Sequence, residues 1–204
     1  MTKIKEVILA TKNQNKVKEI KKILKETNFK NIKIKTLLDF PDIPEISEDA
    51  KTFYGNALLK AKTVWRYLKK PVLAEDSGLC VHALNGMPGI RSARFAGPDG
   101  TQKKLISKLL LMMKNKKDRR AFFKAVVVMI LPSGKIISGS GTVKGYISDK
   151  PKGNKGFGYD PVFYYPPLKK TFAELKTEEK NRLSHRRKAL ERVFNKLRTF
   201  LKKD

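Results

Sequence analysis

The chain has 204 residues, 40% of them hydrophobic, which is enough to bury one substantial core and favours a single domain over 1–204. Its 46 lysines and arginines against 19 acids give a net charge of +27, which suits polyanions such as nucleotides or nucleic acids. No apolar run reaches the roughly 20 residues of a membrane helix, so we expect no membrane partner. Residues 1–10 lack a signal-peptide pattern, and the single Cys80 cannot form an internal disulfide. We therefore expect a cytoplasmic protein.

Apolar residues recur along the chain with the spacing of strands and helices in alternation. In chain order, the predicted elements are a strand at 6–10, a helix at 13–26, a strand at 31–36, a helix at 52–70, a strand at 72–75, a helix at 100–114, strands at 122–131, 135–147 and 161–165, and a helix at 184–201. The turn Pro132-Ser133-Gly134 predicts a hairpin, which argues against an all-parallel sheet. The expected fold is α/β, a long twisted mixed β-sheet flanked by helices.

The turn between the first strand and the first helix is rich in polar residues. It consists of Thr11, Lys12, Asn13, Gln14, Asn15 and Lys16. A helix start presents free backbone N–H groups and the positive end of the helix dipole, so this turn suits a phosphate. Threonine and asparagine are also favoured helix caps, and the segment by itself fits an ordinary capping turn at least as well. It has no glycine and is not a Walker loop.

Two adjacent acids close the strand predicted at 72–75, in the segment Glu75-Asp76-Ser77-Gly78. Mg²⁺ takes one or two carboxylates together with phosphate oxygens and water, so acids at a strand end suit this cation. The glycine-rich run that follows, up to Gly97, makes an exposed surface turn the less favoured interpretation. The sequence leaves the roles of Glu75, Arg91 and Arg94 open.

The segment Gly156-Phe157-Gly158-Tyr159-Asp160-Pro161 places an aromatic residue between two glycines. Glycines let the backbone approach a flat ligand closely, and Phe157 is the candidate that would stack on it. Taken alone, the segment fits a purely structural turn before a strand equally well.

A basic cluster surrounds the start of the last predicted helix and comprises Lys180, Ser184, His185, Arg186 and Arg187. A purine with a 6-oxo group accepts a hydrogen bond where adenine donates one, so donors here would favour 6-oxo purines. A basic helix end or a nucleic-acid patch fits this cluster alone equally well.

These segments, in this order, resemble the inosine/xanthosine triphosphate pyrophosphatase family, also called Ham1-like. The resemblance rests on TKNQNK at 11–16, EDSG to ARFAG at 75–97, GFGYDP at 156–161 and SHRR at 184–187. It implies hydrolysis of the non-canonical nucleotides dITP, ITP and XTP to the monophosphate and pyrophosphate, with Mg²⁺ as cofactor. It also implies a homodimer whose subunits have two lobes and a central cleft.

The resemblance also implies roles for single residues. Asp76 becomes the base or water-positioning residue and, with Glu48, a metal ligand. The substrate is expected to contact Thr11, Lys12, Asn13, Gln14, Asn15, Lys16, Lys60, Ser77, Phe157, Gly158, Tyr159, Asp160, Lys180, His185 and Arg186. Two departures lie near Glu48. Asp49-Ala50 stands where the family often has Thr-Gly, in the loop that holds Glu48, and Gly55 stands where the family commonly has Glu, which removes a possible acidic neighbour.

Two alternatives stay open. A pyrophosphatase of the Maf-like group would act on pyrimidine or modified bases, and the GFGYDP and SHR pair argues against it. A nucleic-acid binder would use the net charge of +27, but the lysines are spread through the chain, and Glu75 and Asp76 repel a phosphate backbone unless a metal intervenes. Nucleic acid is therefore not expected as the primary partner.

Overall fold

The computed structural model describes residues 4–27, 29, 31–98 and 100–202. Its main elements, in chain order, are β1 (Glu6–Leu9), α1 (Gln14–Lys25), β2 (Lys33–Thr36), α2 (Phe53–Leu68), β3 (Val72–Val81), α3 (Gln102–Met112), β4 (Arg120–Ile130), β5 (Ile136–Ile147), β6 (Phe163–Tyr165), β7 (Lys170–Thr171), α4 (Thr177–Leu183) and α5 (His185–Leu201). The strands form one sheet in the order β2-β1-β3-β4-β5-β6-β7. β1 is parallel to β2 and β3, whereas β6 is antiparallel to β5 and β7. The predicted mixed α/β sheet is confirmed.

Side-chain caps set where the first two long helices begin. Asn13 accepts hydrogen bonds from the backbone N–H groups of Asn15 and Lys16, so α1 begins directly after it. Thr52 caps α2 in the same way by accepting from the N–H of Gly55. The helices predicted at 13–26 and 52–70 are therefore confirmed.

The strand predicted at 72–75 begins at the predicted residue, but its predicted end is wrong, because β3 continues to Val81. Leu79 and Val81 are fully buried, which stabilises the extended conformation beyond the acids. Gly78 allows β3 to lie close to a neighbouring segment, since a Cβ there would clash with the carbonyl of Gly89 and the hydroxyl of Ser92. The two acids consequently lie inside a strand and not at its end.

Two further differences concern the region after residue 147. The strand predicted at 161–165 begins as a short 3-10 helix, Asp160–Val162, and only Phe163–Tyr165 is extended. The short elements β7 and α4 were not predicted.

The chain folds into two compact units, and β3, β4 and β5 contribute to both. Unit 1 comprises the described parts of Met1–Asp76, Ala125–Gly141 and Arg186–Asp204, and unit 2 comprises those of Ser77–Lys124 and Thr142–His185. The single domain, the two lobes and their cleft stay predictions. Across the part of the chain that the structure describes, no helix is long and apolar enough to cross a membrane.

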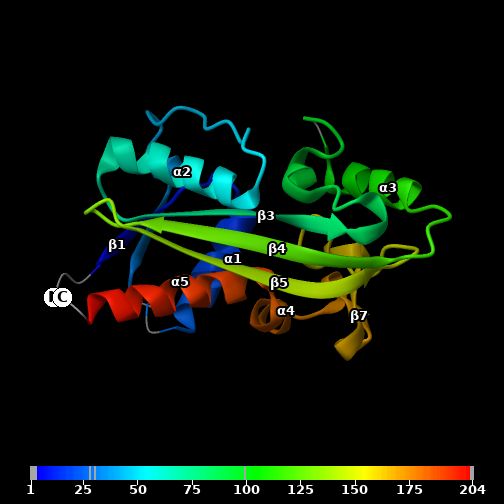
Figure 1. Ribbon diagram of the computed structural model, residues 1–204. Helices are drawn as coiled ribbons and strands as arrows, with labels where there is room; N and C mark the ends of the chain where they lie inside the picture. Colours follow the sequence, from blue (N-terminus) through cyan, green and yellow to red (C-terminus); the bar gives the residue numbers. More distant parts are fainter. Residues whose placement is uncertain (1–3, 28, 30, 99, 203–204) are drawn as a thin grey trace. The chain divides into compact units, whose positions relative to one another are not determined.

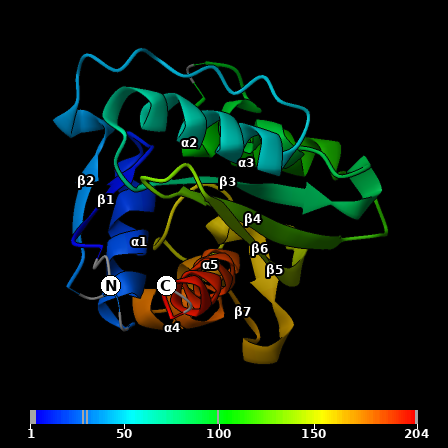
Figure 2. The ribbon, with the colours of Figure 1, turned by 60° about the vertical axis from the view of Figure 1, so that its left-hand side comes forward.

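In unit 1, alternating residues of the strands serve two separate apolar clusters. In β1, Val7 and Leu9 belong to the cluster that α1 and α5 cover, whereas Ile8 belongs to the cluster under α2. Figure 1 shows α2 on one side of these strands and α5 on the other, and Figure 2 shows α1 and α5 side by side. Each fully buried aliphatic side chain contributes about 1.5–3 kcal/mol to this packing.

Unit 2 has an aromatic core. The ring centroids of Phe123 and Phe163 lie 4.6 Å apart, and those of Phe163 and Phe172 lie 4.8 Å apart in an edge arrangement. Leu105 and Leu109 of α3 pack into the same cluster. This core supports the segment from Phe157 to Asp160, because Tyr159 and Val162 are buried within it.

Candidate active site

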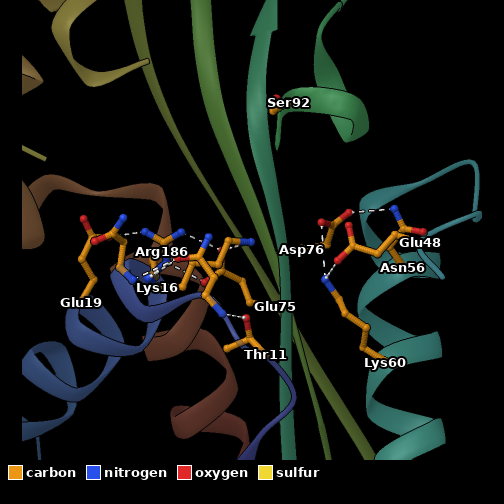
Figure 3. A network of polar contacts seen from close by, with 12 residues as sticks. Thr11, Lys16, Glu19, Glu48, Asn56, Lys60, Glu75, Asp76, Ser92 and Arg186 are labelled. Carbon is orange, nitrogen blue, oxygen red and sulfur yellow. Dashed lines mark hydrogen bonds and ion pairs between the residues drawn. The ribbon is translucent and has the colours of Figure 1, made fainter. Parts of the chain in front are cut away.

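Glu75 and Asp76 are neighbours in β3, and their side chains point to opposite faces of the sheet. Leu73, two residues before Glu75, packs with α1 and α5, and Ala74, two residues before Asp76, packs with α2. The acids follow the same alternation: Glu75 meets Arg186 of α5, and Asp76 meets Asn56 of α2 (Figure 3). Glu75 and Asp76 therefore belong to two separate polar clusters.

The cluster on the α2 side joins two acids, a lysine and an amide. Asn56 Nδ2 donates to Asp76 Oδ2 at 3.0 Å, and Lys60 Nζ lies 3.7 Å from Asp76 Oδ1. Lys60 Nζ also donates to Glu48 Oε1 at 2.5 Å. Asn56 Oδ1 in turn accepts from the N–H of Ala50 at 2.9 Å, which fixes the loop that carries Glu48. The spacing of Asn56 and Lys60 places both on the face of α2 that meets β3.

Asp76 is only 3% exposed, and this burial determines its acidity. Burial raises the pKa of Asp76 above its ordinary value, although the charges of Lys60 and Lys16 and the hydrogen bond from Asn56 partly offset the rise. A carboxylate with a raised pKa binds a proton more strongly, which suits a general base.

Glu48 and Asp76 are the two predicted metal ligands, and both carboxylates face one cation, the ammonium of Lys60. Two oxygen donors that converge on a cationic position suit Mg²⁺, which completes its coordination with phosphate oxygens and water. Among the residues that the structure describes, no three His, Cys, Asp or Glu side chains gather as a metal site. A cation held here by Glu48 and Asp76 would complete its coordination with oxygens of water or substrate.

The cluster on the α1 and α5 side is built around Arg186, which is 1% exposed. Its Nε and Nη2 donate to the two oxygens of Glu75 at 2.6 and 2.9 Å, and its Nη1 donates to Glu19. Burial disfavours the charged guanidinium, but Glu75 and Glu19 together outweigh this effect and raise the pKa of Arg186. Lys16 Nζ lies 3.8 Å from Glu75 Oε1, and burial lowers the pKa of Lys16.

Glu19 was missed by the sequence reasoning, although the sequence carries a signal for it. Residues 16, 19, 20 and 23 share one face of α1, and Ile20 and Ile23 of that face are buried. An acid on a buried face needs a cationic partner, and Arg186 is that partner.

The predicted phosphate turn lies at the start of α1. Lys12, Asn13, Gln14 and Asn15 are exposed, and Thr11 and Lys16 are partly buried. Asn13 caps the helix, and its own N–H donates to Thr11 Oγ1 at 3.1 Å. Capping is therefore one role of this turn, and the contacts of all six residues with phosphate stay predictions.

The predicted base-binding residues lie in unit 2 except for Arg186, which belongs to unit 1. The backbone N–H of Phe157 donates to Asp160 Oδ2 at 2.8 Å, and Lys180 forms an ion pair with the same oxygen. Lys180 Nζ also lies 4.8 Å from the centroid of the Phe157 ring. The ring of His185 stacks on Phe123 at 4.9 Å with an interplanar angle of 12°. Phe157, Asp160 and Lys180 thus form one contact group.

The remaining residues of the predicted site differ in their burial and in their contacts. Tyr159 is buried, and its hydroxyl donates to the carbonyl of Ser92 at 3.0 Å, so its described contact is internal. Gly158 adopts a φ of +62°, a conformation that favours glycine. Ser77 is partly buried, whereas Arg91 and Arg94 are exposed. The substrate contacts of Ser77, Gly158, Tyr159 and Arg186 stay predictions.

The amino-acid sequence is similar to a known protein family and to several named proteins. The sequence model of the Ham1 family matches residues 7–196. The protein named dITP/XTP pyrophosphatase from Geobacillus kaustophilus is 45% identical over 192 residues, 93% of each chain. The one of the same name from Clostridium perfringens is 44% identical over 207 residues, 98% of this chain and 100% of that one.

Solved structures show the same likeness. The Staphylococcus aureus Ham1 protein is 40% identical with a TM-score of 0.81, and the match covers 97% of this chain and 98% of that one. A HAM1 protein from Coxiella burnetii is 35% identical with a TM-score of 0.82, and the match covers 98% and 99% of the two chains. The similarity therefore includes the residues of both units.

Proposed function

The chain belongs to the Ham1 family, and on this basis we propose that it hydrolyses the non-canonical purine nucleotides dITP, ITP and XTP to the nucleoside monophosphate and pyrophosphate. This reaction removes such nucleotides from the nucleotide pool. The relatives named dITP/XTP pyrophosphatase support the reaction class. The observation that carries the proposal within the molecule is the buried Asp76, whose carboxylate faces Asn56 and Lys60.

Asp76 is the general base of the proposed reaction. Its Oδ2 is held by Asn56, so Oδ1 is the oxygen that accepts a proton from the attacking water. The water oxygen forms a bond to the α-phosphorus, the bond from that phosphorus to the bridging oxygen breaks, and pyrophosphate leaves with the bridging oxygen. The raised pKa of Asp76 supports this role, because a stronger base takes the proton more readily.

Glu48 and Asp76 are the residues that would hold Mg²⁺. When bound, this cation neutralises negative charge on the triphosphate oxygens and makes the phosphorus more open to attack. Lys60, whose ammonium lies 2.5 Å from Glu48 and 3.7 Å from Asp76, would then turn to a phosphate oxygen.

The remaining phosphate contacts come from the start of α1. Lys16 supplies a charge, and the turn from Thr11 to Asn15 supplies backbone and side-chain donors, with Ser77 as a further contact. The position of this turn at a helix start supports the assignment, because the helix dipole favours anions there.

The base contacts come from unit 2 and from Arg186 of unit 1. Phe157 stacks on the purine beside Asp160 and Lys180, and His185 and Arg186 supply donors to a 6-oxo group, which adenine lacks. The ion pair between Lys180 and Asp160 supports this assignment, because it fixes a donor within 4.8 Å of the Phe157 ring centroid. A donor that faces the wrong group costs on the order of 1–3 kcal/mol, enough to disfavour ATP.

The experiment is a steady-state panel of ITP, dITP, XTP, ATP and GTP with Mg²⁺, in which pyrophosphate and inorganic phosphate are measured separately. We expect kcat/KM for ITP and XTP to exceed that for ATP by at least about tenfold, as one mismatched donor predicts. Equal rates for all five would remove the proposed selectivity, and faster turnover of UTP or CTP, assayed in the same way, would favour the Maf-like alternative. By family likeness, we also propose a cytoplasmic location and a homodimer. Sedimentation of the purified protein tests the homodimer.

A further inference from the structure

The loop that carries Glu48 is attached to the rest of unit 1 on both sides of that residue. Before Glu48, Ile43 is buried in the apolar cluster under α2, and Ile46 packs against the same cluster. After Glu48, the N–H of Ala50 donates to Asn56 Oδ1 of α2 at 2.9 Å. These two attachments determine where the loop holds the Glu48 carboxylate.

Gly55 lies where this loop meets the first turn of α2. Its φ is outside the left-handed region that favours glycine, and glycine is a poor helix former, so the backbone gives no reason for a glycine here. The space around it does. A Cβ at this position would lie 2.7 Å from the Cβ of Ala50, too short for two carbon atoms, and 3.2 Å from Thr52 Oγ1. Because the Cβ of an alanine moves only with its backbone, the loop itself would have to shift.

Asn56 follows Gly55 and connects the same loop to the acid of β3. Its Oδ1 accepts from the N–H of Ala50, and its Nδ2 donates to Asp76 Oδ2 at 3.0 Å (Figure 3). A Cβ at residue 55 would push Ala50 back from 2.7 Å to the 3.4 Å or more of an ordinary contact. This movement would stretch the bond to Asn56 and displace Glu48, which lies two residues before Ala50.

We propose that Ala50 and Gly55 are positioning residues for Glu48: their close contact sets the place of the Glu48 carboxylate relative to Asp76 and thereby the affinity of the cation site. This inference rests on the proposed function, which assigns these two acids to the metal. Residues 50 and 55 both depart from the pattern of the Ham1-like family. The two departures form one contact, because the methyl group of Ala50 fills the space that Gly55 leaves open.

Gly55→Ala tests the contact, because the added methyl group forces the loop away from α2. Alanine is the better helix former, so an effect confined to the helix would be stabilising. The probe is Mn²⁺, which takes the same oxygen ligands as Mg²⁺ and whose free form is measured by electron paramagnetic resonance without any turnover. We expect Gly55→Ala to bind Mn²⁺ about tenfold more weakly, as when a group that orients a metal ligand is disturbed.

Adding Ala50→Gly to Gly55→Ala should reverse this loss. It removes the clashing methyl group but keeps the backbone N–H that binds Asn56. The nearest neighbours of the new Cβ are then Thr52 Oγ1 at 3.2 Å and the Cα of residue 50 at 3.9 Å, which small shifts accommodate. We expect the double variant to bind Mn²⁺ within about threefold of the wild type. The matched control is Tyr54→Ala, a change at the exposed neighbour of Gly55, which should leave the affinity unchanged.

Two further measurements separate the position of Glu48 from a general loss of structure. In Gly55→Ala, the amide of residue 50 should exchange its hydrogen at least about fivefold faster, whereas the amides of β4 should keep their protection. In a Glu48→Gln background, adding Gly55→Ala should change Mn²⁺ affinity by less than about twofold, because the displaced side chain no longer carries the charge. A general disturbance of the site would weaken Mn²⁺ binding in this background as well.

Unchanged Mn²⁺ affinity in Gly55→Ala would overturn the inference. A loss that Ala50→Gly does not reverse, or one that persists in full without the Glu48 carboxylate, would overturn it too, as would wild-type protein that binds no Mn²⁺. Because none of these measurements depends on turnover, a failure of the proposed reaction appears separately, as wild-type protein that binds Mn²⁺ and shows the expected pattern but does not hydrolyse ITP.

Discussion

Lys60 donates to Glu48 at 2.5 Å and thereby holds the acid that sequence and family likeness assign to the metal. The same ammonium lies 3.7 Å from Asp76, so a single positive charge faces both predicted ligands. The role of Glu48 in binding the metal can therefore be tested with variants of its loop that leave the two acids of β3 unchanged.

Replacing Glu48 by Gln should raise the Mg²⁺ concentration for half-maximal ITP hydrolysis by at least about tenfold, since one of two carboxylate ligands loses its charge. Titration of the rate with Mg²⁺ measures this shift, and chelation with EDTA should abolish the wild-type rate. Glu45→Gln, an exposed acid in the same loop, is the control and should leave the titration unchanged. An unchanged titration for Glu48→Gln would remove Glu48 from the metal site.

Replacing Asp76 by Asn should lower kcat by at least about 100-fold, because the amide cannot accept the proton of the attacking water. The same change should stabilise the fold at neutral pH. A folded-state pKa above the unfolded one means that the charged form of Asp76 is disfavoured by folding, so stability is lost as pH rises through that pKa. Thermal unfolding at pH 7 should therefore show a higher midpoint for the variant, and a lower one would contradict this electrostatic account.

The pH profile of kcat/KM should fall on the acid side as Asp76 becomes protonated. Because burial raises the pKa of Asp76 in the absence of a cation, and a bound Mg²⁺ would lower it, the midpoint should lie above the ordinary value of about 3.9 at the lowest Mg²⁺ concentration that supports turnover. The hydrogen bond from Asn56 lowers this pKa, so Asn56→Ala should move the midpoint to still higher pH. A midpoint that stays in place or moves down would show that the profile reports another group.

Replacing Phe157 by Ala should raise the KM for ITP by about tenfold, within the range of roughly 1–3 kcal/mol that stacking of a base on an aromatic ring contributes. Phe157→Trp keeps an aromatic face and should retain most of the affinity. Binding of inorganic tripolyphosphate, which has no base, should be the same in all three proteins. A loss of tripolyphosphate binding in the alanine variant would point to a structural role for the ring.

Regular patterns explain which parts of the fold could be predicted. The last helix was expected at 184–201 and is α5 (His185–Leu201), because its apolar residues recur on one face over several turns. The helix at 13–26 was predictable for the same reason and because Asn13 is a good cap.

The course of β3 beyond Glu75 depends on tertiary contacts that a local pattern does not contain. Glycines and a proline after Ser77 are typical of a turn, but Gly78 lies against Gly89 and Ser92, and this approach keeps the strand extended. As a result, the side chains of Glu75 and Asp76, which were expected to work together, point to opposite faces of the sheet. The partners of Arg186 were hidden for a related reason, since Glu19 is distant from it in sequence.

The most direct test of the account follows the oxygen of the attacking water. ITP is hydrolysed in water enriched in oxygen-18, and both products are analysed by mass spectrometry. If Asp76 directs water to the α-phosphorus, the label appears in inosine monophosphate and the pyrophosphate carries none. Label in pyrophosphate, or release of inorganic phosphate with inosine diphosphate, would contradict the proposed reaction.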